Sequence, residues 1–266
     1  MNKEITCIIQ ARLSSSRLPG KVLLYGYDKP LILHLVERLK MSKHIKKIII
    51  ATTNQKIDKP IIDLCKKNKI SYFSGHPKNV LKRYYDCAKK YKIKNIMRIT
   101  SDCPLMDYRI VDKVIKEYQK EKYSYVSNIN PTTTPDGFDI EIFSFKILRN
   151  TFMNARKKYE LEHVTPYIWD NPKKFKILNV KIFQNDKFYR KYRLTLDYLE
   201  DYFVIHNIYN SLYKKKKNFS LKDIIRYLVN NKNILINKKY IKVNWFRHHM
   251  KDLKTINRND TNLKIK

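Results

Sequence analysis

Short runs of β-branched residues alternate with longer segments of helical periodicity in the first half of the chain. The helical period is clear where Leu31, Leu35, Val36 and Leu39 recur on one side of a segment. Alternation of this kind predicts a mostly parallel sheet covered by helices on both faces, a three-layer α/β/α architecture. Strands are predicted at Ile5–Gln10, Lys47–Thr52, Ser71–Ser74, Asn95–Thr100 and Tyr123–Ser127, with helices at Pro30–Met41, Asp58–Asn68, Asn79–Lys90 and Arg109–Lys120.

The pattern changes after residue 127. Residues 128–137 contain Pro131, Pro135 and three threonines, a composition that predicts a loop. We expect one α/β domain over residues 1–213 with an excursion at about 128–185, followed by a basic helical extension over 214–266 that ends in a polar tail. Beyond the loop we predict an edge strand at Phe138–Phe143, strands at Lys174–Phe183 and Tyr189–Thr195, and helices at Phe145–Lys158, Glu160–Asp170, Tyr198–Leu212 and Leu221–Val229.

Composition bounds the class of protein. Hydrophobic residues make up 43% of the 266 residues, enough for a substantial core. No run of about 18 apolar residues occurs, so we expect no membrane span. The N-terminus lacks the pattern of a signal peptide, which predicts a cytoplasmic protein. Four cysteines lack Cys-x-x-Cys spacing and are expected to be buried, reduced thiols: Cys7, Cys65, Cys87 and Cys103.

The formal net charge of +33 raises the question of a nucleic-acid partner. The lysines are spread along the chain rather than gathered in one segment, and the whole sequence is rich in Lys, Asn, Ile and Tyr. Dispersed charge supports only weak, non-specific binding to nucleic acid. We therefore expect no specific nucleic-acid partner, and a basic nucleic-acid-binding protein is the alternative from another class.

A polar, basic loop follows the first predicted strand. Between Arg12 and Lys21 it holds three cations, the hydroxyls of Ser14–Ser16, and Gly20. Cations and hydroxyls can meet a polyphosphate, and glycine adopts backbone angles that other residues resist. The loop is not a Walker A motif, because Val22 follows the lysine where that motif has a hydroxyl residue. Ligands of such sheets bind at the carboxyl ends of strands, which is where this loop falls.

Two acids also follow predicted strands. Asp102 comes after the strand that ends at Thr100, and Pro104 stops further pairing. Asp197 follows the strand predicted to end at Thr195. An acid at the carboxyl end of a strand, beside a phosphate loop, is well placed to hold Mg²⁺. The alternative for Asp102 is that it caps the next turn.

Together these segments resemble the motifs of the sugar cytidylyltransferases, most closely the SpsF-type branch named for spore-coat polysaccharide biosynthesis. The enzymes that activate Kdo and neuraminic acid are more distant. Residues 11–21 resemble Ala-Arg-x-x-Ser-x-Arg-Leu-Pro-Gly-Lys, Arg98–Leu105 resembles Arg-x-Thr-x-Asp-Cys-Pro-Leu, and Thr195–Asp201 resembles Thr-[Leu/Val/Ile]-Asp-x-x-x-Asp. Ser14 stands where the branch usually has glycine. The resemblance spans roughly residues 4 to 210 and implies a fold of the nucleotide-diphospho-sugar transferase type.

The resemblance implies roles for residues of these motifs. Asp102 and Asp197 would hold Mg²⁺, and Asp201 is interpreted as a first-turn acid favoured by the helix dipole. Catalytic roles fall to Arg12, Lys21 and Asp102. Contacts with the nucleotide fall to Ala11, Arg12, Ser15, Arg17 and Lys21.

Three further segments give weaker indications. The stretch from Pro135 resembles Pro-x-Gly-x-Asp-x-Glu, which implies that Asp139 and Glu141 contact the acceptor sugar. Their shared strand face points both toward the cleft, and the alternative is a solvated edge-strand face. His163, in a Glu-His-Val-Thr-Pro match, is assigned to sugar binding or to a role as a base, with helix packing as the alternative. Arg83 is placed near the nucleotide by a similar match, with a salt-bridged surface arginine as the alternative, and Thr52 is predicted to line the base pocket.

The predicted reaction transfers CMP from CTP to a sugar hydroxyl and releases pyrophosphate, with Mg²⁺ as cofactor. By resemblance, the acceptor is an acidic or modified sugar destined for a surface polysaccharide, and the protein forms a homodimer. Arg12, Arg17 and Lys21 suit the charge of the leaving pyrophosphate. The alternative within this fold is a glycosyltransferase that uses a nucleotide sugar, but the Asp-x-Asp common in those enzymes is missing at Asp102.

Overall fold

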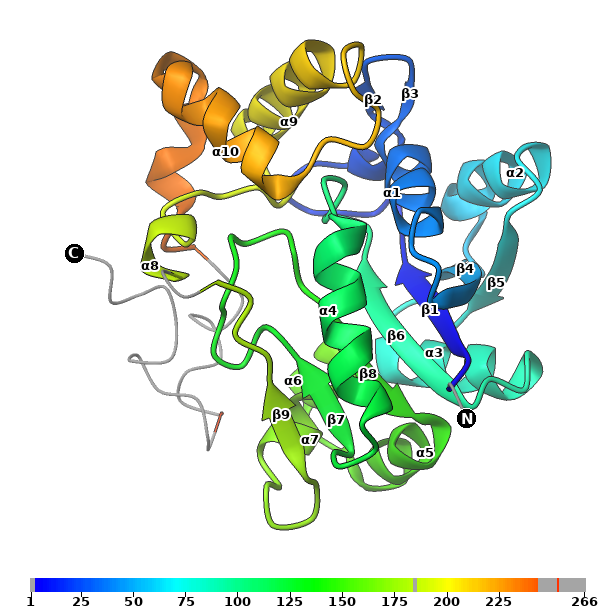
Figure 1. Cartoon of the computed structure of the whole chain (residues 1–266). Coiled ribbons are helices and arrows are strands. Elements are labelled where there is room, and N and C mark those ends of the chain that lie inside the picture. The colour runs from blue at the N-terminus through cyan, green and yellow to red at the C-terminus, as the bar shows by residue number, and fades with distance from the viewer. Residues whose placement is uncertain (1–2, 184–185, 244–252, 254–266) are drawn as a thin grey trace.

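A seven-stranded sheet forms the centre of the molecule, in the order β5-β4-β1-β6-β8-β7-β9 (Figure 1). The computed structural model describes residues 3–183, 186–243 and 253. β8 pairs antiparallel with both of its neighbours, and the other strand pairs of the sheet are parallel. The strands are β1 (Ile5–Gln10), β4 (Ile45–Thr53), β5 (Ser71–Gly75), β6 (Asn95–Thr100), β7 (Tyr125–Ser127), β8 (Glu141–Ser144) and β9 (Ile177–Asn179), and a small hairpin joins β2 (Tyr25–Gly26) to β3 (Lys29–Pro30).

Alternating side chains of the strands build one hydrophobic core on each face of the sheet, as the period of two in a strand requires. Cys7 and Ile9 of β1 enter the larger core, while Ile8 between them enters the other. The larger core is covered by α1 (Leu31–Lys40), α2 (Lys59–Lys67), α4 (Tyr108–Gln119), α9 (Leu199–Leu212) and α10 (Leu221–Asn230). The other is covered by α3 (Val80–Lys90), α5 (Phe145–Asn154), α6 (Lys158–His163) and α7 (Pro166–Trp169).

The architecture predicted for the first half is confirmed. β1 and β6 have the predicted bounds, and β4, β5 and β7 differ from theirs by one or two residues at an end. The helices α1 to α4 agree equally well. Strong periodicity and short loops explain this agreement, because each element there buries one face against its neighbours in sequence.

Several predictions for the second half were wrong. Phe138–Phe143 is not an edge strand, because β8 begins at Glu141 and lies between β6 and β7. Tyr189–Thr195 is not a strand: α8 (Asp186–Tyr189) ends there, and a single bridge joins Arg193 to Asp136. Of Lys174–Phe183, only β9 pairs with the sheet.

The helix predicted at Glu160–Asp170 is two helices. Val164 has a φ of +73° and follows the end of α6, and Pro166 begins α7. Proline disfavours helical geometry in the residue before it, which is why the helical periodicity is interrupted there. The helix predicted at Phe145–Lys158 also ends earlier, at Asn154.

The segment after residue 213 packs against the same core as the sheet. Phe219, Leu221, Ile224 and Leu228 are at most 1% exposed and belong to the larger core. Two short 3₁₀ helices follow α10, at Lys232–Ile234 (η3) and Ile236–Tyr240 (η4), and both contact α9. Apart from residue 253, the predicted polar tail beyond residue 243 lies outside the described residues.

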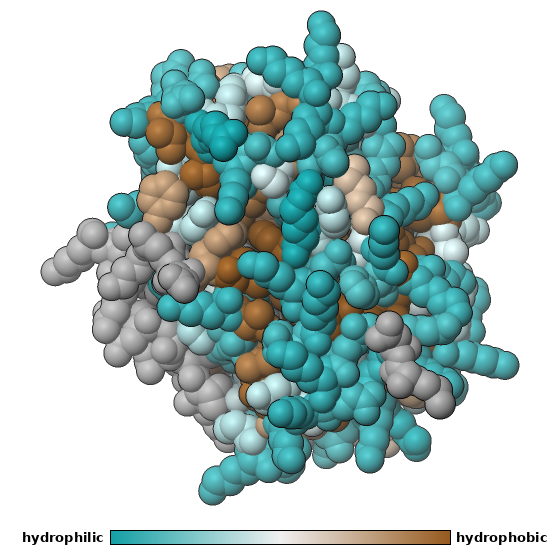
Figure 2. Space-filling view, viewed as in Figure 1, coloured by the Kyte–Doolittle hydropathy of each residue, from teal (hydrophilic) through white to brown (hydrophobic). Residues whose placement is uncertain are grey.

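Hydrophilic side chains are spread over most of the face seen in Figure 2, with smaller hydrophobic areas between them. Among the described residues, no helix has both the length and the apolar character needed to cross a bilayer. All four cysteines are buried and free, and burial raises the pKa of each thiol.

His34 of α1 is fully buried and predicts a specific pH dependence of stability. Its Nε2 lies against the Gly26 carbonyl, and its ring is 4.1 Å from the ring of Tyr209. Burial lowers the pKa of His34 to about 4 from 6.5, against the opposing effect of the Gly26 carbonyl. Between these two values the unfolded chain binds more protons, so stability falls as the pH falls.

Lowering the pH from about 7.5 to about 5 is expected to remove about 2 kcal/mol of unfolding free energy through His34 alone. Urea unfolding at both pH values should show a steeper loss in the wild type than in His34→Asn, which cannot take up a proton. All other titrating groups are common to both proteins. Equal losses in the two proteins would contradict this prediction.

Candidate active site

A cleft of about 420 Å³ opens beyond the carboxyl ends of β1 and β6. Parallel strands deliver their following loops to this edge, so residues far apart in sequence meet there. Most of the residues singled out in the sequence line this cleft, namely Ala11, Arg12, Ser15, Arg17, Lys21, Arg83, Asp102, Asp139, His163 and Asp197.

The loop after β1 is shaped by its own backbone. The Ala11 amide donates to the Ala51 carbonyl at 3.1 Å, and the Gly20 amide donates to the Leu13 carbonyl at 2.9 Å. Gly20 has a φ of +71°, a left-handed conformation that glycine tolerates best. Lys21 then begins η1 (Lys21–Leu23) with its side chain directed into the cleft. Ser14 is exposed and does not line the cleft, so its side chain does not crowd this site.

Asp102 and Asp197 come together because their loops are hydrogen-bonded to each other. The Asp102 carbonyl accepts from the Leu196 amide at 2.9 Å and from the Thr195 hydroxyl at 3.2 Å. Lys21 Nζ lies 2.8 Å from Asp197 Oδ1 and 3.6 Å from Asp102 Oδ2. One ammonium therefore contacts both carboxylates that the sequence paired.

The charges of this cluster shift the pKa values of its members. Burial alone would lower the pKa of Lys21, but Asp102 and Asp197 outweigh it and the pKa is raised. Burial would raise the pKa of Asp197, but Lys21 and Arg17 outweigh it and the pKa is lowered. Both groups are consequently held in their charged forms at neutral pH.

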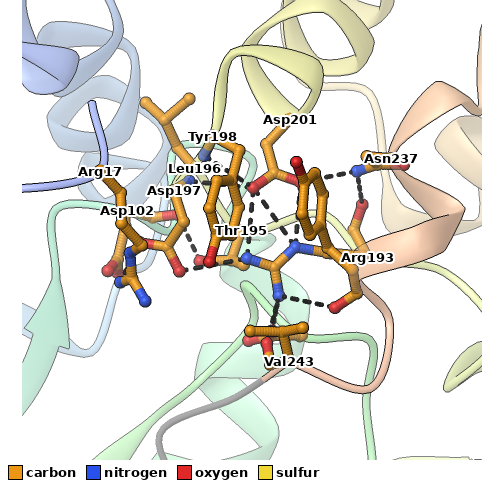
Figure 3. A network of polar contacts seen from close by, with 12 residues as sticks. Arg17, Asp102, Arg193, Thr195, Leu196, Asp197, Tyr198, Asp201, Asn237 and Val243 are labelled. Carbon is orange, nitrogen blue, oxygen red and sulfur yellow. Dashed lines mark hydrogen bonds and ion pairs between the residues drawn. The ribbon is translucent and has the colours of Figure 1, made fainter.

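Arg193 connects the acids at this end of the cleft, as Figure 3 shows. Its guanidinium lies 2.9 Å from Asp136, 3.1 Å from Asp197 and 3.0 Å from Asp201. Asp201 also accepts from the amides of Asp197 and Tyr198, each at 3.0 Å, and so caps the start of α9. The interpretation of Asp201 as a first-turn acid describes its position but omits its buried ion pair.

Asp136 reaches the site because Gly137 lets two backbones approach closely. Gly137 has a φ of +104°, and a Cβ there would lie 2.5 Å from the Leu194 carbonyl oxygen. The Leu194 amide donates to the Asp136 carbonyl at 2.9 Å. Burial raises the pKa of Asp136 to about 7, although Arg193 acts to lower it. Burial and the neighbouring acids, Asp136 first among them, also raise the pKa of Asp139.

Two predicted site residues do not line the cleft. Thr52 is fully buried in β4. Glu141 is 1% exposed and forms an ion pair with Arg98, and it accepts from the hydroxyls of Tyr125 and Thr165. The prediction that Glu141 faces the cleft together with Asp139 was wrong, because Asp139 precedes β8 while Glu141 begins it and is opposite Arg98 of β6.

The remaining predicted residues lie deeper or further along the cleft. Arg83 is buried rather than a surface arginine, and it donates to the carbonyls of His76 and Pro77 at 3.1 and 3.2 Å. His163 ends α6 and lines the cleft. Sequence reasoning missed other residues that line the cleft. Gln10 was the easiest of these to predict, because it is a polar residue at the end of β1. The missed polar, charged or aromatic residues are Gln10, Arg98, Thr100, Ser101, Asp136, Glu162, Trp169 and Thr195.

The donor set suits a hard divalent cation. Within the described part of the chain, no group of three or more His, Cys, Asp or Glu side chains is arranged to hold a metal. Mg²⁺, however, usually takes one or two carboxylates and completes its octahedron with water and phosphate oxygens. Asp102 and Asp197 are two such carboxylates, and they face a cleft that also carries cations suited to phosphates. The residues present therefore fit Mg²⁺ bound together with a nucleotide.

Asp58, which sequence reasoning missed, holds the loop after β1 in place. It is fully buried at the end of η2 (Lys56–Asp58), accepts from the Leu13 amide at 2.6 Å, and also accepts from the Thr53 hydroxyl. Asp58→Ala is expected to cost about 2 kcal/mol of stability and to raise the KM for the nucleotide about tenfold. Unfolding and kinetic measurements against exposed Asp63→Ala check this, and an unchanged KM would contradict it.

The fold and the site are those of a nucleotidyltransferase, with acids and cations gathered in the cleft at the carboxyl ends of parallel strands. A family model described as Cytidylyltransferase matches residues 6–241. The chain belongs to the cytidylyltransferase family. The match reaches beyond residue 210, where the recognisable motifs ended, and includes η4.

Individual relatives agree with this family. The chain is 37% identical to an uncharacterized protein of Methanocaldococcus jannaschii over 235 residues, which cover 87% of this chain and 93% of the relative. It is 32% identical to the spore coat polysaccharide biosynthesis protein SpsF of Bacillus subtilis, covering 77% of this chain and 86% of that protein. A solved cytidylyltransferase from Leptospira borgpetersenii superposes with a TM-score of 0.82 at 35% identity, covering 88% of this chain and 98% of that one.

Proposed function

We propose that this enzyme transfers CMP from CTP to a sugar hydroxyl and releases pyrophosphate, in the synthesis of a surface polysaccharide. The observation that carries the proposal is the convergence of Asp102 and Asp197 on Lys21 in the cleft that also holds Arg12 and Arg17. Membership of the cytidylyltransferase family supports CTP as the nucleotide, and the similarity to SpsF supports a role in polysaccharide synthesis. Family membership also favours this reaction over the glycosyltransferase and nucleic-acid alternatives.

The proposed chemistry needs positioning and charge more than it needs a nucleophilic side chain. The sugar hydroxyl loses its proton to solvent as its oxygen attacks the α-phosphorus of CTP and a new P–O bond forms. The bond from the α-phosphorus to the oxygen that bridges to the β-phosphate breaks, and its electron pair leaves with pyrophosphate. Arg12, Arg17 and Lys21 meet the negative charge that develops on the leaving pyrophosphate. Lys21 and Arg17 are engaged with Asp197 in this structure, and the phosphates of an arriving nucleotide would compete for them.

Asp102 and Asp197 are the residues proposed to hold Mg²⁺. When bound, the ion would neutralise phosphate charge and orient the triphosphate. The protein itself positions the substrates: its cationic side chains bind the phosphates, and the cleft holds the acceptor sugar close to them.

The acceptor is assigned to the part of the cleft that Asp139, His163 and Trp169 line. Arg98 lines the cleft as well, and its Nε has no hydrogen-bond partner among the described residues. Because the Arg98 guanidinium is already paired with the buried Glu141, an acidic acceptor is proposed from the family resemblance alone.

Measuring pyrophosphate release tests the proposal. Purified enzyme with Mg²⁺ is given each of the four ribonucleoside triphosphates in turn, with a panel of acidic, amino and neutral sugars. Release is expected with CTP, and only when a suitable sugar is present and Mg²⁺ has not been chelated. If no nucleotide binds in a direct titration and none releases pyrophosphate with any sugar, the proposal is wrong.

A further inference from the structure

The segment from Ile236 to Val243 lies far along the chain from the sequence motifs. It is nevertheless connected to the acids of the cleft through Arg193. Arg193 Nη1 donates to the Val243 carbonyl at 2.8 Å and lies 3.4 Å from the Tyr240 carbonyl. Asn237, 1% exposed in η4, donates from Nδ2 to the Arg193 carbonyl at 3.0 Å and to Asp201 Oδ1 at 2.8 Å. Figure 3 shows Val243 next to the guanidinium, and Asn237 beyond it on the side away from Asp197.

Every N–H group of the Arg193 guanidinium has an acceptor. Nε donates to Asp201, Nη2 divides its donors between Asp197 and Asp201, and Nη1 divides its donors between Asp136 and Val243. The side chain is 1% exposed, so a lost acceptor could not be replaced by water without opening the structure. The planar guanidinium therefore has one orientation in which all of its N–H groups are hydrogen-bonded. That orientation depends on the carbonyl groups of Tyr240 and Val243.

Arg193 does not line the cleft, but two of its partners do. Asp136 and Asp197 both face the cavity, and Asp197 Oδ2 is the oxygen that Arg193 holds at 3.1 Å. Lys21 and Arg17 contact the other oxygen, Oδ1. The orientation of the Asp197 carboxylate is thus fixed by Arg193 at one oxygen and by Lys21 and Arg17, on the cleft side, at the other.

The segment is also fastened to the first turn of α9, immediately after Asp197. The ring of Tyr240 stacks on that of Tyr198 with centroids 4.0 Å apart and planes 8° from parallel. Lys239 and Glu200 form an ion pair at 2.7 Å on the outer side. A shift of the segment would consequently move Arg193 and the acids that it holds.

We propose that Ile236–Val243 acts as a C-terminal brace for the active site, and that Arg193 and Asn237 are positioning residues through which it fixes the Asp197 carboxylate for cation binding. The inference rests on the proposed function, because it assigns the brace a role at the Mg²⁺ site. It gives the region beyond residue 213 a part in the chemistry. Residues that orient a metal ligand in this way typically change metal affinity about 10- to 100-fold when they are removed.

The decisive variant is Asn237→Ala, with Lys238→Ala as the matched control, because Lys238 is an exposed residue of the same short helix. Mn²⁺ serves as the spectroscopic probe, and its affinity is measured by electron paramagnetic resonance in the presence of CTP and without an acceptor. We expect Asn237→Ala to weaken Mn²⁺ binding about tenfold and to raise the Mg²⁺ concentration for half-maximal rate by a similar factor. We expect Lys238→Ala to leave both unchanged.

A purely structural role would lower the thermal midpoint of Asn237→Ala but leave its Mn²⁺ affinity within about twofold of the wild type, and this result would overturn the inference. If Asn237→Ala does not fold, Arg193→Lys decides by the same two measurements, because it keeps the charge but loses the planar fork. Wild-type protein that binds neither Mn²⁺ nor CTP would count against the proposed function itself. Wild-type binding that Asn237→Ala and Arg193→Lys both retain would count against the brace alone.

Discussion

Replacing Lys21 with methionine is expected to lower kcat/KM for CTP about 10³-fold. Lys21 Nζ contacts both cleft acids and the Leu196 carbonyl, and its pKa is raised, so the wild-type side chain carries a positive charge at the point where the phosphates are proposed to bind. Methionine has a similar length and supplies no charge. Steady-state kinetics of pyrophosphate release, together with a CTP titration, measures the effect.

The control for Lys21→Met is Lys40→Met at the exposed end of α1, which removes one lysine from the same basic protein. Lys21→Arg should recover part of the activity, since it restores the charge but not the compact shape of an ammonium. If kcat/KM of Lys21→Met stays within about tenfold of the wild type, the phosphates are bound by residues other than Lys21.

Asp197→Asn is expected to be equally damaging, with kcat/KM reduced about 10³-fold and a much weaker response to Mg²⁺. The carboxylate faces Lys21, Arg17 and Arg193 at 2.8, 2.7 and 3.1 Å. Removing its charge takes away a proposed metal ligand and leaves these cations with less compensation. Kinetics over a series of Mg²⁺ concentrations measures the loss, with Asp86→Asn on the surface of α3 as the control.

The pH dependence of stability gives an independent check on Asp197. Its pKa is lowered in the folded protein, so its charge stabilises the fold above the ordinary value of 3.8, and this contribution is lost as the pH falls through the folded value. The wild type should therefore be more stable than Asp197→Asn at neutral pH, and the difference should shrink in acid. A difference that stays constant from neutral pH into acid would show that the ion pairs contribute nothing.

Local patterns were sufficient where an element meets its neighbours in sequence. β1, β6 and the helices between them follow from hydrophobic periodicity, because each buries one stripe against an adjacent element. The same patterns placed Arg12, Lys21 and Asp102 in loops that follow strands, and a parallel sheet brings such loops to one edge. The meeting of Lys21 with Asp102 is a consequence of that rule.

Patterns misled where a polar residue is buried by a distant partner. Glu141 has the alternation expected of a solvated edge strand, but the ion pair with Arg98 and the hydroxyl of Tyr125 allow it to lie inside the sheet. Arg193 sits in a segment that was predicted to be a strand, yet its buried side chain is bound by three acids. Arg98 lies 43 residues from Glu141 and Asp136 lies 57 residues from Arg193, so no local window contains these two interactions.

By itself, the sequence determined the three-layer architecture, the basic loop and the acids that follow its strands, because these depend on side-chain period and on the geometry of a parallel sheet. Only the tertiary structure decided that Arg193 joins Asp136 to Asp197, that Asp58 holds the loop after β1, and that Asn237 reaches back to the same cluster. The physical reason is that a buried charge is stable only beside its partners, and which partners it finds is settled by how distant segments pack.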